Sequence, residues 1–268
     1  MNEYYLLTLL IAAGYLTGIL VGMLGIGGGL IFVPLLYLIL PFTKVDPSQI
    51  SYIALGTSLF SGSIATVTSG TKHFLKKNTD SGKAVLIASG SIIASFIFPF
   101  FVVNVKPFFL QIIFAFIFIF AAVRMYFENG SSIIFSGIIL SEKYLPAFGF
   151  LVGGISAFSG IGGGILFVPI LVYLYGTEIK KAIGTSSIIT ACTMISSSLS
   201  YSIQEVTGFG VPYQIGYIYL IAGLPLGIAS ALGSLTGVKI VLKTSSPRLK
   251  KIFAVLLIVI VIKIIFGA

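Results

Sequence analysis

The sequence predicts an all-α integral membrane protein built from two inverted repeats of five helical elements each. Of the 268 residues, 57% are hydrophobic and only 9% are charged, whereas soluble domains carry about 25% charged residues. The apolar residues form runs long enough to cross a hydrocarbon core, which takes roughly 20 residues of helix. A glycine-rich segment occurs twice, once in each half of the chain.

The apolar runs define ten helical elements, five on each side of a polar connector at residues 131–144. The first half, residues 1–130, has elements at 4–24, 27–41, 50–71, 83–104 and 107–127. The second half, residues 145–268, has elements at 145–159, 162–176, 181–203, 212–237 and 249–266. The first run lacks a preceding basic region and a small-residue cleavage site, so we expect a retained helix.

Two matches in the same order indicate an internal duplication. Residues 25–36 (GIGGGLIFVPLL) match residues 160–171 (GIGGGILFVPIL) at nine of twelve positions, an offset of 135. The Gly-Thr-Ser segment at 56–58 returns at 184–186, an offset of 128.

The Lys and Arg side chains predict the orientation in the membrane. An odd number of crossings per repeat, with or without a re-entrant pair, turns the second repeat upside down. One side then receives thirteen of the sixteen Lys and Arg residues, and the other receives Lys44, Lys106 and Lys263. Because basic loops stay in the cytoplasm, we expect a cytoplasmic connector and both termini outside the cell membrane. Topology therefore explains the net charge of +9, and no nucleic-acid partner is expected.

The repeated glycine segments predict broken or re-entrant helices. Each glycine costs about 1 kcal/mol relative to Ala in a helix, and the prolines that follow, Pro34 and Pro169, should kink the restarting helices. A helix that restarts inside the membrane presents its positive N-terminus to a cavity, so two facing breaks would form an anion site. The candidate ligands are Gly25, Gly27, Gly28, Gly29, Gly160, Gly162, Gly163 and Gly164.

Close helix packing is the alternative for such small-xxx-small spacings. We favour packing for Gly223/Gly227 and Gly233/Gly237, and a functional break for the duplicated motif, because packing alone needs fewer glycines.

Hydroxyl groups of the second repeated motif could complete the anion site. They belong to Thr57, Ser58, Thr185 and Ser186. Such a hydroxyl can bind an oxyanion, or it can bond the carbonyl four residues back in its own helix, and the sequence leaves both open. Most other Ser and Thr residues of these two helices are expected to pack against neighbouring helices.

Titratable groups are scarce within the spans. All seven acids fall at span ends or in loops, so no buried carboxylate is expected to relay protons. His73 lies among Lys72, Lys76 and Lys77, where an interfacial basic cluster is the favoured interpretation and a proton or anion entry point the alternative. No metal site or cofactor is expected.

The paired GxGGGxxxVP motifs, each followed by Gly-Thr-Ser, resemble the TauE/SafE family of sulfite exporters over essentially the whole chain. The resemblance implies export of sulfite or a sulfur-containing organic anion such as sulfoacetate, with a proton gradient as the suggested driving force. Family members often have a His at the end of the third helix of a repeat. His73 matches it, whereas Tyr201 takes the corresponding place in the second half.

The leading hypothesis is therefore a secondary carrier for a small anion that works by alternating access, with the lipid bilayer and the anion as its partners. A passive anion channel, or a permease for another small anion, is the alternative within transport. An intramembrane enzyme is disfavoured because no nucleophile with a paired base is visible in the spans, and a membrane scaffold is disfavoured because soluble surface is scarce. The oligomeric state stays open.

Overall fold

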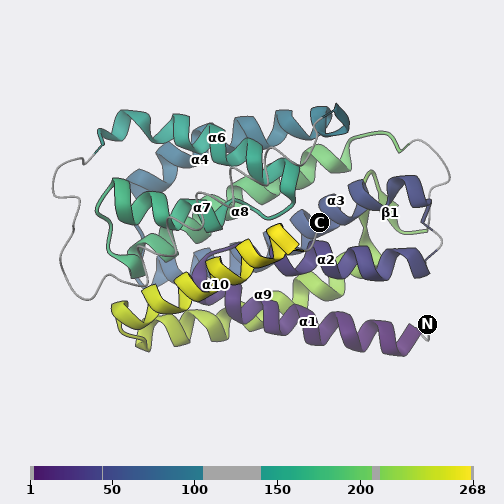
Figure 1. Ribbon diagram of the computed structural model, residues 1–268, viewed down its shortest axis with the longest axis horizontal. Helices are drawn as coiled ribbons and strands as arrows, with labels where there is room; N and C mark the ends of the chain where they lie inside the picture. The colour runs from purple at the N-terminus through teal and green to yellow at the C-terminus, as the bar shows by residue number, and fades with distance from the viewer. Residues whose placement is uncertain (1–2, 44, 105–139, 207–211, 267–268) are drawn as a thin grey trace.

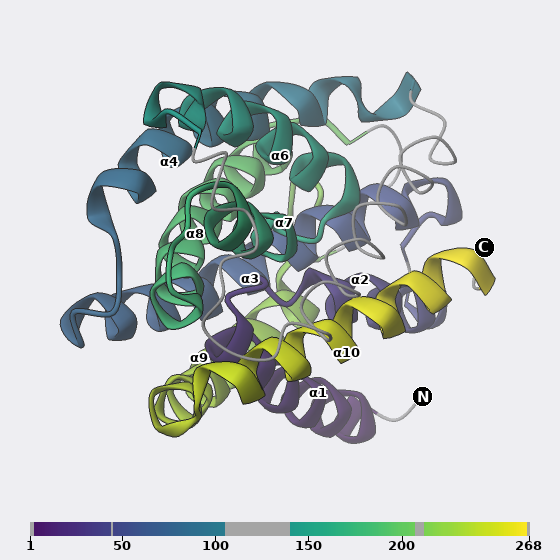
Figure 2. The same ribbon diagram turned by 60° about the vertical axis from the view of Figure 1, so that its left-hand side comes forward.

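The structure, a computed structural model, describes residues 3–43, 45–104, 140–206 and 212–266. Its first half contains α1 (Glu3–Leu24), α2 (Gly29–Ile39), η1 (Leu40–Phe42), η2 (Pro47–Gln49), α3 (Ile50–Leu75), α4 (Ser81–Ile97) and η3 (Phe98–Asn104). Its second half contains η4 (Glu142–Tyr144), α6 (Leu145–Ser159), α7 (Gly164–Pro169), η5 (Ile170–Leu174), α8 (Ile179–Ser202), β1 (Gln214–Ile215), β2 (Ile218–Tyr219), α9 (Leu220–Lys243) and α10 (Ser246–Phe266). The helices form one bundle (Figures 1 and 2).

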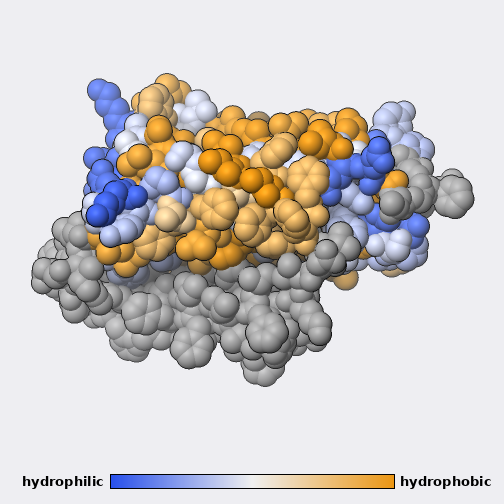
Figure 3. All heavy atoms as spheres, turned by 90° about the horizontal axis from the view of Figure 1, so that it is seen from above, coloured by the Kyte–Doolittle hydropathy of each residue, from blue (hydrophilic) through white to orange (hydrophobic). Residues whose placement is uncertain are grey.

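Five helices of the described chain are long and apolar enough to cross a membrane. They include α1, α3, α4, α8 and α9. Figure 3 shows an apolar belt across the middle of the visible face, with hydrophilic residues gathered toward both ends. The prediction of an all-α membrane protein is confirmed.

Small residues let the outer helices pack backbone to backbone. On α1, Gly18 and Gly22 lie directly against the main chain of Ser230 and Ser234 on α9. On α6, Gly149 and Gly153 lie in the same way against α4. The predicted packing role of the α9 glycines is also confirmed, because Gly233 and Gly237 face α1 while Gly223 and Gly227 face α3.

The two hydroxyl-rich helices, α3 and α8, form the interior of the bundle. They are the most buried of the five spans, and they pack along each other in the centre of the molecule (Figure 2). Most of their hydroxyls bond helix backbone, as expected for packing residues. Examples are Ser61, which donates to Thr57 O and Gly223 O, and Ser196, which donates to Ile92 O.

The structure departs most from the predicted elements at α9, which ends at Lys243 and not at 237. The expected helix at 212–237 begins only at Leu220, because the preceding residues form a β-hairpin that turns through Gly216 at φ 51°. Pro34 lies inside α2, whereas Pro169 ends α7 and the chain continues as the π-helix η5. The predicted helix at 107–127 and most of the connector lie outside the described residues.

Candidate functional site

Both glycine segments interrupt the helices, as predicted. Helix α1 ends at Leu24 and α2 begins at Gly29, while α6 ends at Ser159 and α7 begins at Gly164. The intervening glycines adopt left-handed backbone, for instance φ 82° at Gly28 and 75° at Gly163. L-residues other than Gly pay about 1–2 kcal/mol there, so these turns require glycine.

The two turns lie in direct contact. A Cβ added to Gly29 would collide with the Gly160 carbonyl, and one added to Gly164 would collide with the Gly25 carbonyl. The two breaks, residues 25–28 and 160–163, are therefore packed main chain against main chain in the interior of the protein.

At the start of α2, some backbone N–H groups have a hydrogen-bond acceptor and others do not. The N–H groups of Ile31 and Phe32 donate to Gly28 O. Within the described residues, no acceptor is recorded for the N–H groups of Gly27, Gly28 or Gly29. Unpaired donors at a helix N-terminus carry partial positive charge, so this turn favours an anion.

The carbonyls that the breaks leave without helical partners are bonded by side chains of the opposite half. Ser58 Oγ donates to Gly160 O at 3.0 Å, and Ser186 Oγ donates to Gly25 O at 3.0 Å while also lying 3.2 Å from Gly164 O of its own half. Because Gly160 and Gly25 hold equivalent places in the two halves, the motif of each half supports the break of the other.

The threonines of the motif also make reciprocal contacts. Thr57 Oγ1 accepts from the N–H of Tyr219, which caps α9, at 2.9 Å. Thr185 Oγ1 accepts from the N–H of Asp80, which caps α4, at 2.8 Å, and donates to Lys181 O. All four hydroxyls are buried and bonded to main chain in this conformation.

His73 is not part of an interfacial basic cluster, so the favoured interpretation of this residue is wrong. Its side chain is fully buried. Its Nε2–H donates to Gly22 O at 3.2 Å, and its Nδ1 accepts from Asn78 Nδ2 at 3.0 Å. A second Asn78 Nδ2 hydrogen reaches Lys180 O, so His73 joins α1, just before its break, to the start of α8.

Tyr201 makes the corresponding bond in the second half. Its hydroxyl donates to Ala157 O at 3.1 Å, and Ala157 precedes Gly160 by three residues as Gly22 precedes Gly25. A helix that stops at a break cannot supply the next N–H for these carbonyls. His73 and Tyr201 therefore satisfy equivalent carbonyls with different chemistry.

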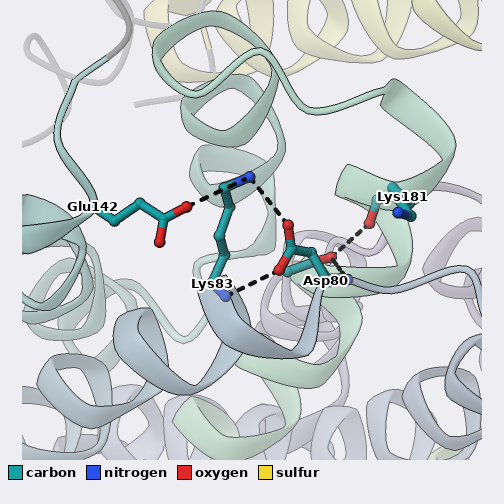
Figure 4. A network of polar contacts seen from close by, with 5 residues as sticks. Asp80, Lys83, Glu142 and Lys181 are labelled. Carbon is teal, nitrogen blue, oxygen red and sulfur yellow. Dashed lines mark hydrogen bonds and ion pairs between the residues drawn. The ribbon is translucent and has the colours of Figure 1, made fainter.

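An ion network lies where α4 and α8 begin (Figure 4). Lys83 Nζ lies 3.0 Å from Asp80 Oδ2 and 4.0 Å from Glu142 Oε1. Partial burial favours a raised pKa for Asp80, but the hydrogen bonds of Lys83 and the charges of Lys83 and Lys181 outweigh it, so the pKa is lowered. Since Thr185 bonds the main chain of Asp80, the network is joined to the hydroxyl motif.

Two residues of α8 that the sequence interpretation did not assign to the site lie at the breaks. Thr190 is fully buried, touches Gly27 and Gly164, and its hydroxyl has no hydrogen-bond partner. Met194 is fully buried against Gly27 and Gly162. Their proximity arises from the tertiary fold, and in the sequence Thr190 is one hydroxyl among many. No cluster of three potential metal ligands lies within the described residues.

Comparisons with known proteins place the chain among membrane transporters. The family model for the sulfite exporter TauE/SafE matches residues 10–264. A probable membrane transporter protein of Haemophilus influenzae is 33% identical over 98% of both chains. One of Methanocaldococcus jannaschii is 31% identical over 91% of this chain and 90% of its own. No solved structure matches the chain.

Proposed function

The chain belongs to the TauE/SafE family and is a membrane transporter, and from this premise we propose that it is a secondary carrier that exports a small anion. Sulfite, or a sulfur-containing organic anion such as sulfoacetate, is the proposed substrate. The family of sulfite exporters to which the chain belongs supports a substrate that contains sulfur. A negative charge on the substrate has independent support, because α2 begins at Gly28 and Gly29 and a helix N-terminus carries partial positive charge.

The proposed anion site lies where the two breaks meet. The observation that carries it is that Thr190 meets both breaks: its methyl group faces Gly27, where the N–H groups of 27–29 are unpaired, and its unbonded, buried hydroxyl lies against Gly164. Buried polar groups without partners are costly, and an oxyanion accepts hydrogen bonds from both kinds of donor. The glycines of both breaks would line the site, and Thr57, Ser58, Thr185 and Ser186 would frame it.

Two inverted repeats, residues 1–130 and 145–268, are proposed as the moving parts. Reciprocal contacts support the symmetry: α1 packs on α9 while α6 packs on α4, and the hydroxyl motif of each half bonds the break of the other. Alternating access would follow from rocking of one repeat against the other.

The basic residues support a proposed orientation of the protein in the membrane. Twelve of the thirteen residues expected on the cytoplasmic side are described, and bonds such as Asn78 to Lys180 O and Lys180 Nζ to Leu242 O bring their segments to one end of the bundle. We propose that this end faces the cytoplasm, so that both termini are outside the cell membrane.

His73 is the proposed proton carrier, because imidazole exchanges protons near neutral pH and the His73 imidazole bonds α1 beside a break.

Purified protein in liposomes tests the proposal. We expect saturable uptake of radiolabelled sulfite or sulfoacetate that a proton gradient accelerates, with counterflow when the inside is preloaded with unlabelled anion. Liposomes that pass none of these anions under any gradient would refute the substrate. Non-saturable flux without counterflow would replace the carrier by the passive channel.

A further inference from the structure

One side chain fills the point where the two breaks meet. A Cβ built on Gly27 would lie 3.2 Å from Met194 Sδ, and one built on Gly162 would lie 2.8 Å from Met194 Cε and 2.9 Å from its Sδ. Gly27 and Gly162 are equivalent residues of the two breaks. The thioether of Met194 is therefore placed between them.

Met194 has room at this point because the two halves carry different residues at equivalent positions. At the offset that aligns the Gly-Thr-Ser motifs, Met194 corresponds to Thr66 and Thr190 corresponds to Gly62. A Cβ on Gly62 would collide with Met194 Cε. The glycine of one half thus makes room for the methionine of the other, and of the equivalent pair Thr66 and Met194 the second half supplies the larger side chain.

Nothing polar holds Met194 strongly in place. Its one recorded hydrogen bond within the described chain is the 4.0 Å contact from Thr66 Oγ1 to the sulfur, and sulfur is a weak acceptor. Methionine is unbranched, with three rotatable side-chain bonds. It can adopt another rotamer without breaking a strong hydrogen bond, unlike the hydroxyls that bond the break carbonyls.

We propose that Met194 is a movable plug that occupies the anion site in this conformation and swings out when the anion binds. The proposal rests on the anion site argued above. Thr190 lies beside Met194 at Gly27, which its methyl group faces, while its unbonded hydroxyl lies against Gly164 of the other break. That hydroxyl is the polar group that the incoming anion would satisfy. Removing the plug therefore removes a competitor of the substrate.

Transport kinetics give the first test. If the plugged state is populated to about 70–90%, its loss should lower the apparent KM about three- to tenfold, and we expect this for Met194→Ala with sulfite as the substrate. Met194→Leu, which retains a large apolar side chain, should keep the KM near that of the parent. Ile189→Ala is the matched control, because Ile189 is fully buried on the same helix within an apolar cluster. An unchanged KM in Met194→Ala, or an equal fall in Ile189→Ala, would overturn the proposal.

A labelling experiment gives a second test that requires no transport. In a Cys192→Ser background, the thiol of Met194→Cys should react with an anionic methanethiosulfonate reagent, because the shorter side chain opens the site to anions. The Ile189→Cys thiol should stay unlabelled, and sulfoacetate should slow the first reaction. Labelling of Met194→Cys no faster than that of Ile189→Cys would overturn the plug. Selective labelling in a protein that moves neither sulfite nor sulfoacetate would uphold the plug while rejecting the proposed substrates.

Discussion

Replacing Ser58 with Ala tests whether the hydroxyl motif supports the opposite break. Ser58 is fully buried, and its hydroxyl bonds Gly160 O at 3.0 Å. The chain turns at Gly160 and a new helix begins at Gly164, so the helix itself offers that carbonyl no replacement donor. A buried acceptor left unbonded costs about 1–3 kcal/mol, whereas hydrogen bonds between membrane helices average about 0.6 and reach about 1.7 kcal/mol. We therefore expect Ser58→Ala to lower the free energy of unfolding by about 1–2 kcal/mol.

Ser63→Ala is the matched control on the same helix. The Ser63 hydroxyl donates to Phe60 O at 2.7 Å, but Phe60 lies inside α3, so its carbonyl keeps a helical partner. We expect a change below about 0.5 kcal/mol, typical of a substitution that leaves no buried group unsatisfied. Reversible unfolding in bicelles would measure both variants.

The symmetry of the contacts extends the test. Ser186→Ala should also destabilise the protein by about 1–2 kcal/mol, because Ser186 bonds Gly25 O at the distance at which Ser58 bonds Gly160 O and contacts Gly164 O in addition. If Ser58→Ala were no less stable than Ser63→Ala, the idea that these hydroxyls satisfy the break carbonyls would be refuted.

Three further predictions use other parts of the chain. Gly28→Ala should destabilise the protein more than Gly176→Ala and should reduce anion flux. Both residues have positive φ, but of the two only a Gly28 Cβ meets a neighbour, Phe32 Cε2, at 2.9 Å. Thermal unfolding and liposome flux measure these effects, and equal effects of the two substitutions would contradict the prediction. Asp80→Asn should destabilise at pH 7, because the lowered pKa of Asp80 adds stability above its ordinary value of 3.8 and loses it as the pH falls through the folded value; a stability gap that does not narrow as the pH falls below 3.8 would contradict this. In a Cys192→Ser background, Lys76→Cys should react with impermeant thiol reagents from the cytoplasmic side and Phe42→Cys from outside, and the reverse pattern would refute the proposed orientation.

Hydropathy and glycine spacing were enough to predict the helices and both breaks. A lipid-facing chain must satisfy its backbone within helices, so the apolar runs locate the described spans; α3 extends from the expected 71 to Leu75, and α9 extends from the expected 237 to Lys243. The start of α9 was missed because Val-Pro-Tyr-Gln-Ile-Gly-Tyr-Ile-Tyr carries no charge and runs directly into the apolar residues that begin at Leu220. Its aromatic and β-branched residues around Gly216 are typical of a hairpin, and that signal was available.

The environment of His73 could not be predicted from neighbouring residues. Three lysines nearby in sequence indicate an exposed cluster, but helix α3 directs the imidazole inward. There it meets Gly22 of α1 and Asn78 beyond its own helix. Such a contact depends on how distant helices cross, which local sequence does not determine.

At the breaks, equivalent positions of the two halves that carry the same residue (matched) have a different role from those that carry different residues (unmatched). Matched residues build the frame, since Ser58 and Ser186 bond equivalent carbonyls. Four pairs of equivalent positions that carry different residues surround that frame. They are His73 and Tyr201, Gly62 and Thr190, Thr66 and Met194, and Thr17 and Val152. In the last pair, Thr17 touches Gly28 and Val152 touches Gly163. A carrier with two identical halves would present the same surface to both sides of the membrane. We therefore expect substitutions at the unmatched positions to alter affinity, coupling or direction, and substitutions at the matched positions to alter stability first.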